Sequence, residues 1–193
     1  MTRALVLFAH PVPESFSASL HRKVVDTLTT RGWQVDNCDL YAEGFNPVLS
    51  TDERRSYHDT ATNTGTVQTY VDRLRAADAL VLVFPVWNYG YPAILKGFFD
   101  RVFLPGVSFD LANGGIVPAL QNIRKLAAVT TYGGTRLRSF LAGDPPRKIV
   151  TRAVTHVARA GRARYLAMYD MNNATPAQHL AFLNRVGSAM EQF

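Results

Sequence analysis

Three short segments of this chain place hydroxyl, aromatic and glycine residues directly after apolar runs, and they are the candidates for chemistry. They are Ala9-His-Pro-Val-Pro-Glu-Ser-Phe-Ser-Ala-Ser19, Pro85-Val-Trp-Asn-Tyr-Gly90 and Thr130-Thr-Tyr-Gly-Gly134. Each apolar run is typical of a buried strand, and open α/β sheets bind ligands outside the carboxyl ends of their strands. We therefore expect the three segments to form one binding site at one edge of a sheet.

The first segment suits a phosphate group. Ser15 and Ser17 are good helix N-caps, and the free N–H groups at the start of a helix attract anions. A well-capped helix with no ligand is an equally good interpretation of this segment alone. The chain contains no Gly-x-Gly-x-x-Gly and no Gly-x-x-x-x-Gly-Lys-Ser/Thr motif, so neither a dinucleotide fingerprint nor a nucleotide-hydrolysing loop is present. A hydroxyl-rich loop without glycines is more typical of flavin sites.

The second and third segments suit a large flat ligand. Trp87, Tyr89 and Tyr91 offer aromatic surface, and the amides of Gly133 and Gly134 can approach a ring closely. Donors that face the pyrimidine end of a flavin stabilise its anionic reduced form by the same electrostatics as an oxyanion site. The three segments together predict a flavin site.

Metal and hydrolase chemistry are not predicted. The single cysteine, Cys38, excludes an internal disulfide and a cysteine metal cluster. Four further histidines are scattered without a partner at helical spacing, so we expect no zinc site: His21, His58, His156 and His179. No Gly-x-Ser-x-Gly elbow is present to supply a hydrolase nucleophile. We expect Asp39, Tyr41 and Asp100 to serve the structure, at a strand end and in a salt bridge on a helix.

Short apolar runs alternate with helical patterns along the chain. The predicted strands are Arg3–Ala9, Trp33–Leu40, Ala79–Phe84, Leu126–Tyr132 and Arg164–Tyr169. The predicted helices are Ser17–Arg31, Val67–Ala77, Pro92–Phe103, Arg147–Ala160 and Pro176–Gln192. The polar stretch Tyr41–Asn63 is predicted to be a long connecting segment with little regular structure. Such alternation is typical of a parallel sheet covered on both faces. We expect an α/β, flavodoxin-like three-layer sandwich with strand order 2-1-3-4-5, as one domain over residues 1–193.

The net charge of +6 has three interpretations. Most of the 21 basic residues are arginines, and several fall between Arg136 and Arg164. They could form a nucleic-acid surface, hold the phosphates of a nucleotide cofactor, or simply be solvated. No basic run matches a nucleic-acid module, so we expect no nucleic-acid partner.

The apolar runs are short. None approaches the roughly 20 residues that span a bilayer, and Ala4–Ala9 is too short for a signal peptide. We therefore expect a cytoplasmic protein without membrane insertion.

The chain resembles the NAD(P)H:quinone oxidoreductase family of flavodoxin-like flavoproteins, which includes modulators of drug activity and ancillary subunits of potassium efflux systems. The matching motifs span most of the first 145 residues: His10-Pro with Ser15-Phe16, Asp39-Leu-Tyr with Phe45-Asn-Pro47, Phe84-Pro85, Gly90 with Pro92-Ala-Ile-Leu-Lys-Gly97, Asp100-Arg-Val-Phe103, and Thr130-Thr with Gly133-Gly134.

This resemblance implies a tightly bound flavin, usually FAD with FMN as the alternative, and a homodimer with the site at the subunit interface. It also implies ping-pong hydride transfer from NAD(P)H through the flavin to quinones or similar two-electron acceptors. The implied cofactor-binding residues are His10, Ser15, Phe16, Ser17 and Ala18 for the phosphate and ribityl chain, Pro85, Val86, Trp87, Asn88 and Tyr89 for the ring edge, and Thr130, Thr131, Tyr132, Gly133 and Gly134 for the far side.

Two departures separate this chain from the family pattern. Asn88 stands where family members commonly have Trp. Arg136, Leu137 and Arg138 follow the double glycine where the better-known reductases place a Tyr and a His, so no catalytic side chain is transferred to this chain. Two other functions remain open, a flavodoxin-type electron carrier and a regulatory subunit of a membrane transporter.

Overall fold

The computed structural model describes residues 1–112 and 114–193, and a five-stranded parallel sheet lies at its centre. Its strands are β1 (Arg3–Phe8), β2 (Gln34–Asp39), β3 (Ala79–Val86), β6 (Lys125–Tyr132) and β7 (Arg164–Met168), in the order β2-β1-β3-β6-β7. This order is the 2-1-3-4-5 arrangement predicted from the sequence, and each predicted strand is present within a few residues of its expected ends. The flavodoxin-like fold is confirmed.

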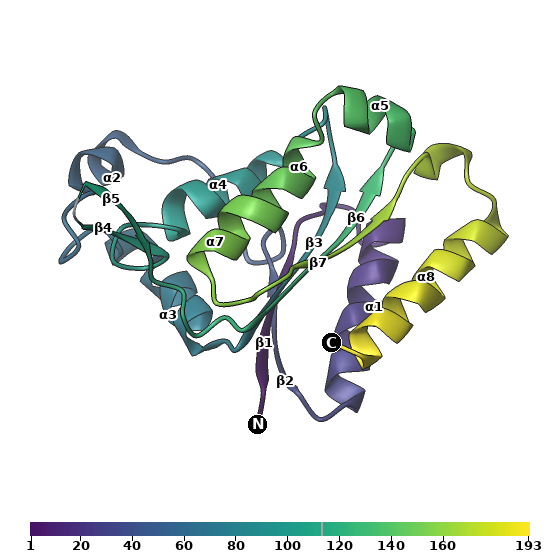
Figure 1. Cartoon of the computed structure of the whole chain (residues 1–193), viewed down its shortest axis with the longest axis horizontal. Coiled ribbons are helices and arrows are strands. Elements are labelled where there is room, and N and C mark those ends of the chain that lie inside the picture. Colours follow the sequence, from purple (N-terminus) through teal and green to yellow (C-terminus); the bar gives the residue numbers. More distant parts are fainter. Residues whose placement is uncertain (113) are drawn as a thin grey trace.

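Helices cover both faces of the sheet (Figure 1). α1 (Phe16–Thr30) and α8 (Pro176–Glu191) lie on one face, and α3 (Gln68–Ala76) and α4 (Ala93–Val102) lie on the other. Successive strand residues point to opposite faces. In β1, Ala4 and Val6 therefore join the core under α1 and α8, while Leu5 and Leu7 join the core under α3 and α4. The two cores hold the sheet rigidly from both sides.

Local sequence explains where α1 begins and ends. The hydroxyl of Ser15 accepts a hydrogen bond from the Ala18 N–H at 3.1 Å, which caps the first turn. Leu20, Val24 and Leu28 recur at intervals of four and are fully buried. Gly32 follows with a φ of +77°, a conformation that glycine adopts without steric cost.

The prediction that Tyr41–Asn63 has little regular structure is wrong in part. α2 (Thr51–Ser56) forms within it, because Ser50 and Glu53 make a reciprocal capping box. The Glu53 carboxylate also pairs with the buried Arg101 guanidinium of α4. The signal was present in the sequence as Ser-x-x-Glu, and the tertiary ion pair then ties this helix to the main body.

The predicted helix Arg147–Ala160 is also corrected. α6 (Pro145–Lys148) continues into η2 (Ile149–Val154), a π-helical segment, and then into α7 (Thr155–Val157). Further elements that we did not predict are short: α5 (Arg136–Leu141), the hairpin β4 (Phe109–Ala112) with β5 (Gly115–Pro118), and the 3₁₀ turns η1 (Gly65–Val67) and η3 (Met171–Asn173). None changes the order of the main sheet.

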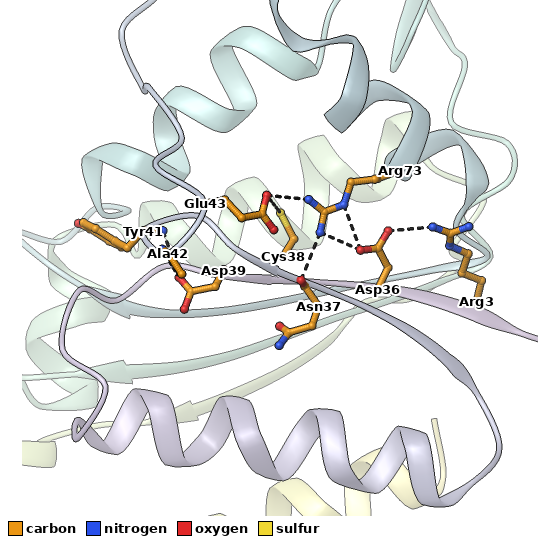
Figure 2. A network of polar contacts seen from close by, with 9 residues as sticks. All are labelled: Arg3, Asp36, Asn37, Cys38, Asp39, Tyr41, Ala42, Glu43 and Arg73. Carbon is orange, nitrogen blue, oxygen red and sulfur yellow. Dashed lines mark hydrogen bonds and ion pairs between the residues drawn. The ribbon is translucent and has the colours of Figure 1, made fainter.

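A polar network anchors the edge strand β2 (Figure 2). The Arg73 guanidinium lies 2.7 Å from a carboxylate oxygen of Asp36 and 2.7 Å from one of Glu43, and Arg3 pairs with the other oxygen of Asp36. Asp39 accepts hydrogen bonds from two backbone N–H groups that follow it, at 3.1 Å each. Asp39 therefore ends the strand, in the structural role that the sequence predicted.

Within the described residues, no helix combines the length and the apolar character that crossing a membrane requires.

Candidate functional site

The three predicted segments meet at one corner of the molecule. β1, β3 and β6 are neighbours in the sheet, so the loops that follow them lie side by side at its carboxyl edge. The His10 and Trp87 rings, from the first and second loops, have centroids 5.7 Å apart. The hydroxyl oxygens of Ser17 and Thr131, from the first and third segments, lie 3.5 Å apart. A site assembled from all three segments is therefore geometrically available.

The first loop presents hydrogen-bond donors. Ser15 uses its oxygen as an acceptor in the helix cap, which leaves its O–H free to donate. The first-turn N–H groups of Phe16 and Ser17 have no carbonyl partner within the helix. His10 Nδ1 accepts a hydrogen bond from the Val12 N–H at 3.0 Å, and burial lowers the pKa of His10. A ring nitrogen that accepts a hydrogen bond carries no proton, so in the neutral imidazole the proton is on Nε2.

The second loop is a tight turn. The N–H of Gly90 donates to the Trp87 carbonyl at 2.8 Å, and the N–H of Trp87 donates to the Gly90 carbonyl at 3.2 Å. Asn88 and Tyr89 occupy the centre of the turn with φ values of +48° and +57°, the pattern of a type I′ turn. Asn tolerates this conformation far better than most residues do, which explains its presence at position 88. Tyr89 is strained.

This turn holds aromatic surface outside the core. The side chains of Trp87 and Tyr89 are 40% and 44% exposed, although both are large and apolar. Backbone strain combined with exposed aromatic rings is typical of ligand sites rather than of structural turns. Tyr91, the third predicted aromatic, lies elsewhere: its ring packs on Phe84, and its hydroxyl donates to the Pro146 carbonyl at 2.9 Å.

The third segment divides its side chains between the two faces of β6. Thr131 points toward α1, where its hydroxyl meets Ser17. Thr130 and Tyr132 point toward the opposite face, as strand alternation requires. Tyr132 is almost fully buried, and its hydroxyl lies 2.6 Å from both Asp144 and Tyr165, so only its backbone reaches the corner.

The two glycines after β6 allow close approach. A methyl group on Gly134 would lie 3.9 Å from the Tyr89 hydroxyl, so the second and third loops face one another. A methyl group on Gly133 would lie 3.2 Å from the Asn172 amide nitrogen, tighter than ordinary contact. Because Gly133 has no side chain, its backbone stays exposed beside Asn172.

The remaining predicted residues pack beneath the corner and do not line it with their side chains. Ala18 and Pro85 are buried, and Val86 is half-buried at the end of β3. The ring of Phe16 lies against His179 of α8, with centroids 4.6 Å apart. Phe16 therefore contributes its backbone N–H at the corner, while its side chain packs between helices.

A fourth loop, which we did not predict, borders the same corner. The N–H of Asp170 donates to the Gly134 carbonyl at 2.9 Å, and Asn172 lies against Gly133. Asp170 has a φ of +56°, so the chain turns sharply after β7. The sequence held the information to predict this loop. Ligands of open α/β sheets bind outside the carboxyl ends of the strands, and β7 is the neighbour of β6 in the predicted order, so its loop must lie at the same edge.

The residues at this corner are compatible with a flavin. The free N–H groups of α1 fit a phosphate, and the exposed rings of Trp87 and Tyr89 fit a flat heterocycle. In residues 1–112 and 114–193, no cluster of three or more His, Cys, Asp or Glu side chains is arranged to hold a metal ion.

Comparison with known proteins places this geometry in a family. A family model described as "Flavodoxin-like fold" matches residues 2–188. NAD(P)H dehydrogenase [quinone] 1 from Rattus norvegicus is 31% identical over 154 residues, which cover 72% of this chain and 56% of the relative. The chain thus spans a little over half the length of that relative.

Two solved structures show the same fold. Smu.1420 from Streptococcus mutans UA159 aligns over 100% of both chains with a TM-score of 0.87 and 26% identity. An FMN-dependent NADH-azoreductase from Bacillus anthracis, solved with FMN, aligns over 100% of this chain and 99% of its own with a TM-score of 0.79 and 17% identity. Together with the strand order and the site at the carboxyl edge, the match over residues 2–188 shows that this chain belongs to the Flavodoxin_2 family of flavodoxin-like proteins.

Proposed function

We propose that this protein is a flavin-dependent NAD(P)H oxidoreductase that reduces quinones or similar two-electron acceptors. The observation that carries the proposal is the convergence of three strand-end loops, with Ser17 against Thr131 and His10 against Trp87. The quinone dehydrogenase activity named for the Rattus norvegicus relative supports this class of reaction, and the FMN named for the Bacillus anthracis neighbour supports a flavin.

The residues of the corner have distinct tasks in this proposal. The O–H of Ser15 and the N–H groups of Phe16 and Ser17 hold the flavin phosphate at the start of α1, where the helix dipole favours negative charge. Trp87 and Tyr89 border the ring system. FAD is expected from the family resemblance, and FMN is the alternative that the Bacillus anthracis structure favours.

A bound flavin would supply the redox chemistry, hydride transfer between NAD(P)H and a two-electron acceptor in two half-reactions. The protein contributes positioning and electrostatics. The backbone around Gly133 and Gly134 would approach the edge of a bound ring closely, because neither residue has a side chain to intervene. The neutral His10 imidazole presents a donor at Nε2 without adding positive charge. None of these tasks requires a side chain that transfers a proton.

We also propose that the active form is a cytoplasmic homodimer with the site at the subunit interface. α5 follows the double glycine directly and exposes three large apolar side chains, those of Leu137, Phe140 and Leu141. Exposed apolar clusters of this kind mark contact surfaces. Their position beside the corner supports a partner subunit that completes the site.

Mass spectrometry of the chromophore released by denaturing purified protein tests the flavin directly. We expect FAD or FMN at about one per chain. Protein that contains no flavin and does not bind FAD or FMN when titrated would overturn the proposal.

Anaerobic addition of NADPH to the flavin-loaded protein tests the reaction class. Direct bleaching of the flavin absorbance is expected of an oxidoreductase, because it accepts a hydride from the nicotinamide. A flavodoxin-type electron carrier would stay oxidised until a reductase is added, and that result would overturn the enzymatic assignment.

A further inference from the structure

A cavity of about 310 Å³ lies beside the predicted flavin corner, between α5 and the start of the α6–η2 segment. Four cationic side chains line it, those of Arg136, Arg147, Lys148 and Arg152. The exposed ring of Phe140 forms part of its wall. Asp144 is the only carboxylate among the lining residues. The cavity therefore has a large excess of positive charge.

The single carboxylate is already engaged. Asp144 accepts a hydrogen bond from the Tyr132 hydroxyl at 2.6 Å and from Arg147 Nε at 3.1 Å. The Arg147 Nη2 donates to the Tyr169 hydroxyl at 3.0 Å, and the guanidinium lies 4.5 Å from the centroid of the Tyr165 ring. These contacts hold Arg147 in one orientation. Among the described residues its Nη1 has no acceptor, so this fixed guanidinium keeps one nitrogen free.

The other three cations are unpaired. Within residues 1–112 and 114–193, the side chains of Arg136, Lys148 and Arg152 make neither an ion pair nor a hydrogen bond. The π-helical turn of η2 sets Lys148 and Arg152 on the same side of the segment as Arg147. π-helical turns inside helices occur frequently at functional sites. Positive charges gathered in a cavity without partners repel one another, and a bound anion removes that cost.

The cavity is connected to the flavin corner through the backbone. On one side, Tyr132 donates a hydrogen bond to Asp144 of the cavity and is followed directly by Gly133. On the other side, Tyr169 of the cavity wall is followed by Asp170, whose N–H donates to the Gly134 carbonyl. A ligand that extends away from the flavin corner on this side of the sheet would meet the cavity next. Arginine matches phosphate oxygens with paired N–H donors.

We propose that this cavity binds a phosphate group of a nucleotide, the 2′-phosphate of NADPH. The proposal rests on the oxidoreductase function proposed above. The four cations surround one small cavity, which favours one small anionic group over nucleic acid, because nucleic acid would need a charged surface that follows its backbone.

Arg136 and Arg138 form a matched pair for the test. Both are exposed residues of α5 with no side-chain partner among the described residues, but only Arg136 lines the cavity. Isothermal titration calorimetry with 2′,5′-ADP measures phosphate binding without a flavin reaction. We expect Arg136→Gln and Arg152→Gln each to weaken this binding about tenfold, and Arg138→Gln to leave it unchanged.

Steady-state kinetics tests the source of the phosphate. We expect Arg136→Gln to raise the KM for NADPH about tenfold and to leave the KM for NADH unchanged. The Kd of the apoprotein for FAD is expected to stay unchanged in the same variant, because the proposed function places the flavin phosphate at the start of α1.

The proposal is overturned if Arg136→Gln and Arg138→Gln behave alike in all of these measurements, or if the wild-type protein does not bind 2′,5′-ADP. Failure of the oxidoreductase function has a different signature, which is wild-type protein that binds no flavin. The calorimetric experiment still decides the cavity in that case, because 2′,5′-ADP binding requires no flavin.

Discussion

The hydroxyl oxygens of Ser17 and Thr131 lie 3.5 Å apart, although 114 residues separate them in the chain. Both side chains are buried at the point where α1 begins and β6 ends. We expect Ser17→Ala to raise the Kd for flavin about threefold, because the variant keeps the backbone N–H but loses the hydroxyl contact that fixes the start of α1 against β6, and a hydrogen bond between neutral groups contributes about 0.5–1.5 kcal/mol. Fluorescence titration of flavin with the apoprotein measures this change.

The control for this prediction lies on the same helix. Thr29 is exposed at the far end of α1, so Thr29→Ala is expected to leave flavin affinity unchanged. Equal affinities for the wild type, Ser17→Ala and Thr29→Ala would show that the Ser17 hydroxyl contributes nothing to the site.

The strained turn at Asn88 and Tyr89 predicts that a variant which relieves the strain is more stable but less active. Tyr89→Gly creates Asn-Gly, the preferred pair for a type I′ turn, and relieves a φ of +57°. We expect the free energy of unfolding to rise by about 1 kcal/mol, since residues in sparsely populated conformations cost about 1–3 kcal/mol. Urea denaturation measures the stability, and steady-state kinetics should show a lower kcat/KM. A less stable Tyr89→Gly variant would mean that the turn is not strained.

Gly97 of α4 packs directly against the backbone of Pro47. A methyl group at position 97 would overlap the carbonyl oxygen and the Cα of Pro47, and backbone atoms cannot rotate away. We expect Gly97→Ala to reduce the free energy of unfolding by about 1–3 kcal/mol, the usual cost of overpacking. Gly65→Ala is the matched control, because a methyl group there meets nothing within 4 Å. Equal urea midpoints for the two variants would contradict the close approach.

The Glu53–Arg101 pair predicts a pH dependence of stability. Partial burial opposes the charge of Glu53, but hydrogen bonds from Thr66, Ser50 and Arg101 lower its pKa from 4.5 to about 2. A carboxylate with a lowered pKa stabilises the fold above its unfolded-state pKa. We therefore expect this contribution to be complete above about pH 4.5 and to fall as the pH approaches 2, in urea denaturation curves recorded across that range.

Removing the guanidinium tests the same pair at neutral pH. Arg101→Met is expected to cost about 3 kcal/mol, because it leaves a partly buried carboxylate without its partner. The exposed pair Arg55–Asp52 is the control, and Arg55→Ala should change stability by less than about 0.5 kcal/mol. Similar losses for the two variants would show that Arg101 contributes no more than a surface charge.

The sequence by itself determined the strand order and the edge of the sheet where the candidate residues gather. Short apolar runs such as Ala79–Phe84 alternate with helical patterns, and right-handed crossovers leave few arrangements for five parallel strands. The segments at the ends of β1, β3 and β6 must then lie side by side, which is confirmed by the Ser17–Thr131 contact between the first and third and the His10–Trp87 contact between the first and second. These features depend on periodicity within each segment and on general rules of chain handedness, both of which can be derived from the sequence alone.

Tertiary structure alone decided where individual side chains point and which charges have partners. Tyr132 stands among the predicted flavin residues, yet its side chain turns inward to Asp144, because strand alternation places it opposite Thr131. The cationic cavity of Arg136 and Arg152 forms only when α5 and η2 pack beside one another. Such contacts join residues that are distant in sequence, and no local pattern specifies them, because they depend on the packing of the whole chain.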